Sequence, residues 1–160
     1  MESIASKTVN ALRENKMTIA TAESCTGGLV SSKITSVSGS SEVISFSMVT
    51  YSNEVKIEKL GVRRETVEKF GAVSEQTAKE MAERIKILAE ADVGVGVTGV
   101  AGPSQSEGKP VGLVFVAIAF KDRTRVEKLE LGNLSRDEIR EKSAEKALES
   151  VLKGVTDATK

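Results

Sequence analysis

Residues 21–28 read Thr-Ala-Glu-Ser-Cys-Thr-Gly-Gly and directly follow an apolar segment, Met17–Ala20. A segment with helical periodicity begins immediately afterwards, at Leu29. The pattern predicts a buried strand, a tight glycine-containing turn and the start of a helix. Such a turn gathers a serine hydroxyl and backbone N–H groups at one point, which suits a nucleophile with its own oxyanion site or a cradle for an anion. This stretch alone does not decide between the two.

Outward from this turn, strands and helices alternate along the chain, which predicts an α/β layered fold with a mixed, mostly parallel sheet of about five strands. The short turn Lys121-Asp122-Arg123 joins the last two strands, so at least one pair is antiparallel. Strands are predicted at 17–22, 43–51, 92–100, 111–120 and 124–131, and helices at 4–15, 29–37, 53–60, 64–70, 74–91 and 135–153.

The composition excludes several functional classes. The 160 residues, 39% hydrophobic and 29% charged, fit a single soluble domain over residues 1–160. Lys plus Arg and Asp plus Glu both number 23, so we expect no nucleic-acid partner. There is no secretory leader and no apolar run long enough to span a membrane, so we expect a cytoplasmic protein without a membrane partner. The single cysteine, Cys25, excludes an internal disulfide framework.

The absence of histidine restricts the chemistry further. It excludes a Ser-His-Asp triad, a Cys-His pair and every zinc site that uses histidine. Acid–base chemistry must then use Lys, Tyr, Asp or Glu. A serine can be activated by a lysine whose pKa is lowered by desolvation, with a tyrosine to relay the proton. No metal cluster is visible in the sequence, and we expect neither a metal nor another cofactor.

Polar residues follow three of the predicted strands, where the carboxyl ends of strands line the crevice of an α/β sheet. The first strand end carries Ser24, the second carries Tyr51 and, five residues later, Lys56, and the third carries Thr98. We therefore expect these side chains to converge on one pocket. Glu23 either orients the lysine or satisfies the turn, and the sequence leaves both roles open.

The chain resembles the C-terminal domain of the competence/damage-inducible CinA proteins, a domain that also occurs alone as nicotinamide-nucleotide amidase. The resemblance covers almost the whole chain, in order and with the family's spacing. The matching segments are Ala22-Glu23-Ser24-Cys25-Thr26-Gly27-Gly28, Val49-Thr50-Tyr51-Ser52-Asn53-Glu54 with Lys56, Gly71-Ala72-Val73-Ser74, Thr98-Gly99-Val100-Ala101-Gly102-Pro103, and Lys109-Pro110-Val111-Gly112.

This resemblance implies an amidohydrolase that converts nicotinamide mononucleotide to nicotinate mononucleotide and ammonia. It implies Ser24 as nucleophile, Lys56 as base and Tyr51 as a third catalytic residue. It also implies a three-layer α/β/α sandwich and a homo-oligomer that takes a small-molecule nucleotide substrate. We expect the substrate-binding residues, including the oxyanion donors of the turn, to be Thr26, Gly27, Gly28, Asn53, Thr98, Gly99, Gly102, Arg136 and Arg140.

Two segments depart from the family pattern. Relatives carry Asp-Gly-Gly or a similar stretch after the Gly-Pro, whereas this chain has Ser104-Gln105-Ser106. Leu134 and Ser135 replace a glycine and an aspartate that precede the arginine at position 136. These departures motivate an alternative hypothesis, a catalytically silent CinA-like protein that binds a nucleotide or a protein partner.

Overall fold

The computed structural model describes residues 1–158 and contains one five-stranded sheet in the order β2-β1-β3-β4-β5. β1 is parallel to both of its neighbours, and β4 is antiparallel to both of its own, so the mixed α/β sheet predicted from the sequence is confirmed. The strands are β1 (Ile19–Glu23), β2 (Ile44–Val49), β3 (Val93–Gly99), β4 (Leu113–Ala119) and β5 (Thr124–Glu130).

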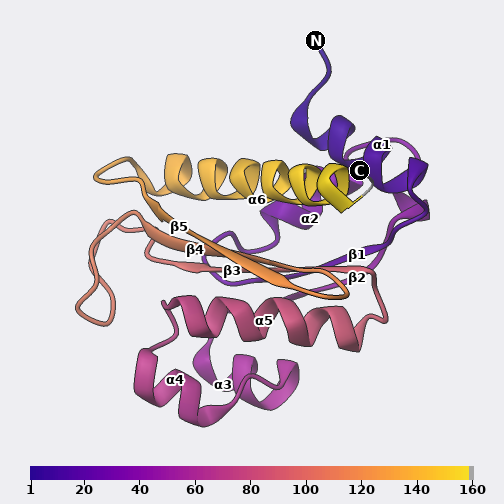
Figure 1. The fold of residues 1–160 in the computed structure, drawn as a ribbon. Helices are drawn as coiled ribbons and strands as arrows, with labels where there is room; N and C mark the ends of the chain where they lie inside the picture. Colours follow the sequence, from indigo (N-terminus) through magenta and orange to yellow (C-terminus); the bar gives the residue numbers. More distant parts are fainter. Residues whose placement is uncertain (159–160) are drawn as a thin grey trace.

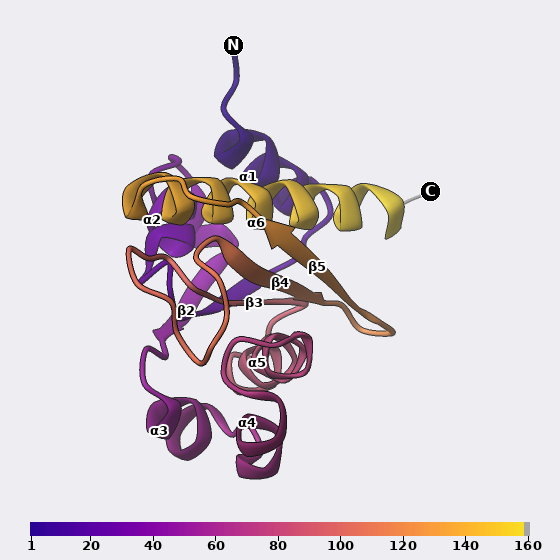
Figure 2. The same ribbon diagram turned by 90° about the vertical axis from the view of Figure 1, so that its left-hand side faces the viewer.

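Helices cover both faces of the sheet and complete a three-layer sandwich (Figure 1). Figure 2 shows the same layers from the side, with the longest helix lying across one face of the sheet. One face carries α1 (Ile4–Glu14), α2 (Leu29–Thr35) and α6 (Arg136–Ala158). The other carries α5 (Glu75–Leu88), with α3 (Asn53–Val55) and α4 (Arg64–Phe70) beyond it. Among residues 1–158, no helix has the length and apolar character needed to cross a bilayer.

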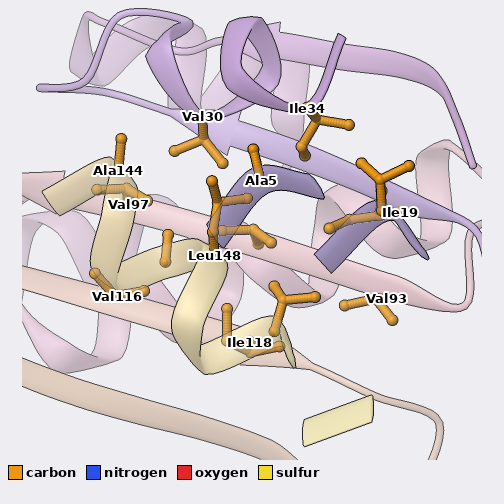
Figure 3. Close-up of a cluster of buried hydrophobic side chains, with 14 of the residues drawn as sticks. Ala5, Ile19, Val30, Ile34, Val93, Val97, Val116, Ile118, Ala144 and Leu148 are labelled. Carbon is orange, nitrogen blue, oxygen red and sulfur yellow. The ribbon is translucent and has the colours of Figure 1, made fainter. Parts of the chain in front are cut away.

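The sequence of β3, Val-Gly-Val-Gly-Val-Thr-Gly, places three valines on one face of the strand and Gly94 and Gly96 on the other. Its valines are fully buried and pack with residues of α1, α2 and α6 in the larger core (Figure 3). On the opposite face, a Cβ added at Gly94 would lie 2.1 Å from the Ala82 carbonyl oxygen of α5. The alternation therefore lets α5 pack directly on the backbone of the strand, because glycine has no side chain to separate them.

Several element boundaries differ from those predicted. β4 begins at Leu113 instead of residue 111, because Gly112 adopts a φ of 89° and lies against the backbone of Gly132. The final helix continues to Ala158, beyond the predicted end at 153. The predicted helix at 53–60 is α-helical only to Val55 and then forms a π-helical turn, Lys56–Leu60, in which the Lys56 carbonyl accepts from the Gly61 N–H at 3.1 Å. Such turns recur at functional sites.

Candidate active site

The polar segments after β1, β2 and β3 surround one pocket at the carboxyl end of these strands. Of the residues predicted to form the site, eight line this pocket: Ser24, Tyr51, Asn53, Lys56, Thr98, Gly99, Gly102 and Arg136.

The centre of the pocket is a direct contact between Ser24 and Lys56. The Lys56 Nζ lies 2.9 Å from the Ser24 Oγ, and both residues are buried. The backbone of Ser24 continues the pairing of β1 with β3, since its N–H donates to the Val97 carbonyl at 2.9 Å. The serine is thus fixed by the sheet, whereas the lysine reaches it from the π-helical turn after β2.

The surroundings of the Lys56 amine bring its pKa closer to neutral pH. Besides the contact with Ser24, Nζ donates to the carbonyl oxygens of Thr50, at 2.8 Å, and Tyr51, at 3.2 Å. Burial lowers the pKa of Lys56 from 10.5 to about 8, although the Glu107 carboxylate partly opposes this shift. A neutral amine has two N–H groups and one lone pair. In that form the two carbonyls account for both N–H groups, which leaves the lone pair for the Ser24 hydroxyl.

Tyr51 contacts the lysine through its backbone, and its hydroxyl lies elsewhere. The side chain is at the rim of the pocket, and the phenol oxygen accepts a hydrogen bond from Nη2 of Arg136 at 3.0 Å. Arg136 also donates from Nη1 to the Gly102 carbonyl. The tyrosine hydroxyl therefore contacts a cationic group at the entrance, and Ser24 and Lys56 contact each other without it.

The Glu23 carboxylate accepts hydrogen bonds from the turn and from the start of α2. Of the two roles that the sequence left open, support of the turn or orientation of the lysine, the structure shows the first. Glu23 is fully buried, and its oxygens accept four hydrogen bonds. The donors are Thr21 Oγ1 at 3.1 Å, Thr26 Oγ1 at 2.7 Å, Val30 N at 2.8 Å and Ser31 N at 3.0 Å. Two of them are backbone groups at the start of α2, where an anion is favoured.

Four residues expected to bind substrate do not line the pocket and lie in the turn that carries Ser24 or support it. The Thr26 hydroxyl donates to Glu23, and the Gly27 N–H donates to the Ser24 carbonyl at 3.0 Å. Gly28 precedes α2 with a φ of 101°, a left-handed conformation that favours glycine. Arg140 donates to two carbonyls of the same turn. None of the four is among the residues that line the described pocket.

Thr98 and Cys25 also line the pocket. The Thr98 hydroxyl is used in a hydrogen bond within the protein, and the Cys25 thiol is protonated. The Thr98 hydroxyl donates to the Ala72 carbonyl at 2.8 Å, so its hydrogen is not directed at a ligand. The Cys25 side chain is buried, and burial raises the pKa of its thiol to about 12. The thiol therefore stays protonated at neutral pH and packs as an apolar group.

Sequence reasoning missed Glu107, which lines the pocket from the loop between β3 and β4. Its carboxylate oxygens accept from the N–H groups of Ala72 and Val73, both at 2.8 Å. Nearby, Lys109 donates to the Phe70 carbonyl at 2.9 Å and also contacts the Val73 carbonyl. The loop is thereby attached to the segment before α5. Ala72, Val73 and Lys109 belong to the family-like stretches, whereas Glu107 lies between two of them, and neither spacing nor residue type indicated that these segments touch.

Comparison with known proteins agrees with this architecture. The family model of the CinA C-terminal domain matches residues 1–155. The chain is 48% identical over 155 residues to a CinA-like protein of Kosmotoga olearia, covering 96% of this chain and 37% of that protein. It is 50% identical over 144 residues to a putative competence-damage inducible protein of Caldanaerobacter subterraneus subsp. tengcongensis, covering 89% of this chain and 35% of that protein. The chain thus spans about a third of the length of these relatives.

A solved structure, that of the competence/damage inducible protein CihA from Agrobacterium tumefaciens, superposes with a TM-score of 0.91 at 39% sequence identity, covering 96% of this chain and 93% of that one. A CinA superfamily protein from Klebsiella pneumoniae superposes with a TM-score of 0.93 at 28% identity, covering 96% of each chain. Family model, sequence relatives and solved structures agree, and this chain belongs to the CinA C-terminal domain family.

Proposed function

We propose that this protein is an amidohydrolase that converts nicotinamide mononucleotide to nicotinate mononucleotide and ammonia, with Ser24 as nucleophile and Lys56 as base. The observation that carries the proposal is the contact of 2.9 Å between Ser24 Oγ and a buried Lys56 amine. The carbonyl oxygens of Thr50 and Tyr51 hold this amine, and its pKa is lowered to about 8. A nucleophile within hydrogen-bonding distance of an amine of lowered pKa is the arrangement that serine–lysine catalysis requires.

The first half of the reaction forms an acyl-enzyme. The Ser24 Oγ attacks the carboxamide carbon while its proton passes to the Lys56 amine. Negative charge develops on the carboxamide oxygen, and the N–H groups of Cys25 and Thr26 are the proposed donors to it. When the tetrahedral intermediate collapses, the protonated lysine returns the proton to the amide nitrogen. The C–N bond breaks and ammonia leaves.

The second half repeats these steps with water. Neutral Lys56 takes a proton from a water molecule, whose oxygen attacks the acyl carbon. The new intermediate expels the Ser24 oxygen, which recovers a proton from the lysine. The product is the carboxylic acid, which loses its remaining proton to solvent to give the carboxylate, and the enzyme returns to its starting state. A single base thus serves both halves, which is why the lysine must exchange its proton near neutral pH.

The nucleotide character of the substrate is proposed from the rim of the pocket and from family membership. Arg136 and Tyr51 place a guanidinium and a phenol at the entrance, and a guanidinium suits a phosphate. Asn53 adds an amide, and Gly99 and Gly102 add backbone to the wall. A single catalytic domain over residues 1–160 and a homo-oligomeric state both remain predictions.

An ammonia-release assay tests the proposal. Nicotinamide mononucleotide, its riboside and free nicotinamide should be compared, and only the first should be turned over efficiently. We expect Ser24→Ala to abolish release, whereas Ser32→Ala, which changes an exposed serine of α2, should behave as wild type. Robust turnover by the Ser24→Ala protein would remove Ser24 from its role. Release from free nicotinamide at the same efficiency would remove the nucleotide requirement.

A second function, binding without turnover, is favoured by one feature of the pocket wall. Ser104 and Ser106 line the pocket where relatives carry glycine-rich sequence. Calorimetric binding of nicotinamide mononucleotide to wild-type protein that releases no ammonia from any nucleotide amide would support this alternative.

A further inference from the structure

The turn that carries Ser24 is held from outside the pocket by Arg140 of α6. Its Nε donates to the Cys25 carbonyl and its Nη2 to the Thr26 carbonyl, both at 3.1 Å. Arg136 lies four residues earlier on the same helix and faces the pocket. The two arginines therefore have different tasks, although their spacing places them on one side of the helix.

The two carbonyl contacts determine where the N–H groups of the turn point. In a trans peptide the N–H lies opposite the carbonyl. The N–H groups of Thr26 and Gly27 share peptides with the two carbonyls that Arg140 binds, so both point away from the guanidinium. The Gly27 N–H is already used by the Ser24 carbonyl, at 3.0 Å. Within residues 1–158, neither the Cys25 nor the Thr26 N–H donates to an oxygen.

The opposite side of the turn is fixed by the buried carboxylate of Glu23, which accepts from the Thr26 hydroxyl at 2.7 Å. The same carboxylate binds two N–H groups of α2. Gly27 makes room for the arginine, since a Cβ there would lie 3.2 Å from Nη2 of Arg140 and the residue has a φ of 58°. The turn is therefore held between an anion that binds its side chain and a cation that binds its carbonyls.

We propose that Arg140 is a positioning residue, which fixes the peptide planes that follow Cys25 and Thr26. The first plane directs the Thr26 N–H at the oxyanion, and the second keeps the Gly27 N–H on the Ser24 carbonyl, whose peptide carries the Cys25 N–H. This inference rests on the proposed amidase function. A guanidinium presents its donors in a rigid fork, so it can hold two carbonyls at once, whereas a lysine ammonium cannot reproduce that geometry. Loss of the fork lets the peptide planes rotate and weakens transition-state binding while leaving the substrate's own contacts unchanged.

The test compares kcat and KM of Arg140→Met, Arg140→Lys and the control Lys142→Met, which changes an exposed cation on the same helix. We expect kcat of Arg140→Met to fall about 10- to 100-fold with KM within about twofold, because only the transition state uses the oxyanion donors. Arg140→Lys should recover part of this loss, and Lys142→Met should match wild type. A tenfold rise in KM with unchanged kcat, or wild-type values for Arg140→Met, would overturn the proposal.

A second readout separates this inference from the proposed substrate. A fluorophosphonate reacts with an activated serine: Ser24 Oγ attacks phosphorus, fluoride leaves, and the serine proton passes to Lys56. Intact mass spectrometry should show wild type labelled faster than Arg140→Met, with urea unfolding used to confirm that both are folded. The acid limb of labelling should stay near pH 8 in both, since the base is unchanged.

The outcomes of the two assays are distinct. If wild type is labelled by the fluorophosphonate but releases no ammonia, the proposed function is contradicted. The labelling rates of wild type and Arg140→Met still test the role of Arg140. Wild type and Arg140→Met labelled at equal rates contradicts the positioning role alone. If wild type reacts with neither the nucleotide amide nor the fluorophosphonate, Ser24 is not an activated nucleophile, and both proposals are contradicted.

Discussion

Two buried ionisable groups lie on either side of the Ser24 turn, and their surroundings differ in kind. Glu23 and Lys56 are 0% and 1% exposed. The carboxylate accepts four hydrogen bonds, two of them from backbone N–H groups at the start of α2. The lysine amine contacts a hydroxyl and two carbonyls, all of them neutral.

The difference in surroundings explains why Glu23 supports the turn and why Lys56 is the group that we propose as reactive. Removing a charge from water is costly, and hydrogen bonds to the charged form repay that cost. The four hydrogen-bond donors around the Glu23 carboxylate offset this cost and hold the side chain in place. Lys56 has no carboxylate in contact with Nζ among residues 1–158, and desolvation lowers its pKa to about 8. A lysine in this state can accept and return a proton near neutral pH.

We expect the largest effect when Lys56 is changed, because within residues 1–158 its amine is the basic group that contacts Ser24 Oγ. Lys56→Met should reduce kcat by about 10,000-fold or more, as removal of one member of a coupled nucleophile–base pair does. Lys59→Met changes an exposed lysine of the same π-helical turn and serves as the control. Ammonia release measures both. A residual rate within tenfold of wild type would contradict the assignment of the base.

Glu23 should instead determine stability. Glu23→Gln turns an NH2 group toward donors that need an acceptor, and we expect a loss of about 3 kcal/mol in the free energy of unfolding. Urea unfolding measures it, with Glu145→Gln on the exposed side of α6 as the control. A Glu23→Gln variant that is as stable as wild type but inactive would show that Glu23 takes part in the reaction and is not a structural group.

The pH dependence of activity should follow Lys56. We expect kcat/KM to rise about tenfold per pH unit below pH 8 and to level off above it, since the free enzyme must carry a neutral amine. A profile that is flat from pH 6 to 9 would show that no group with this pKa limits the reaction.

The free energy of unfolding should also depend on the titration of Lys56, and the direction of the change follows from its lowered pKa. The folded pKa of Lys56, about 8, lies below its ordinary value of 10.5, so the unfolded chain binds more protons between these two values. Wild type should therefore gain stability relative to Lys56→Met as pH rises through this window, by about 3 kcal/mol at most. Urea unfolding of both proteins at pH 7 and pH 10.5 measures the difference, and a constant difference would contradict it.

The smallest effect is expected for the Tyr51 hydroxyl, which bonds to Arg136 and lies away from the amine. Tyr51→Phe removes one rim hydrogen bond and should leave kcat within about threefold of wild type, with a KM increase of the same order. Steady-state kinetics measure both. A loss of 100-fold or more in kcat would show that the hydroxyl relays the proton after all.

Much of the site could be predicted because its members stand at the ends of strands. The apolar segment before Ser24, the spacing of Tyr51 and Lys56 and the glycine pattern of β3 are local features, and each corresponds to an observed element. Periodicity predicts such elements well. The contact of Glu107 with Ala72 and Val73 joins segments about 35 residues apart, and no local pattern indicates it.

The sequence by itself determined the layered α/β fold, the turn at Ser24 and, through the absence of histidine, that any acid–base chemistry must use Lys, Tyr, Asp or Glu. Only the tertiary structure decided the structural roles of the charged groups: Arg136 at the pocket, Arg140 behind the turn, Glu23 as support of the turn and Lys56 in contact with Ser24. The physical reason is that these roles depend on burial and on which groups surround each charge. Both arise only when the strand ends, α6 and the loop after β3 pack together.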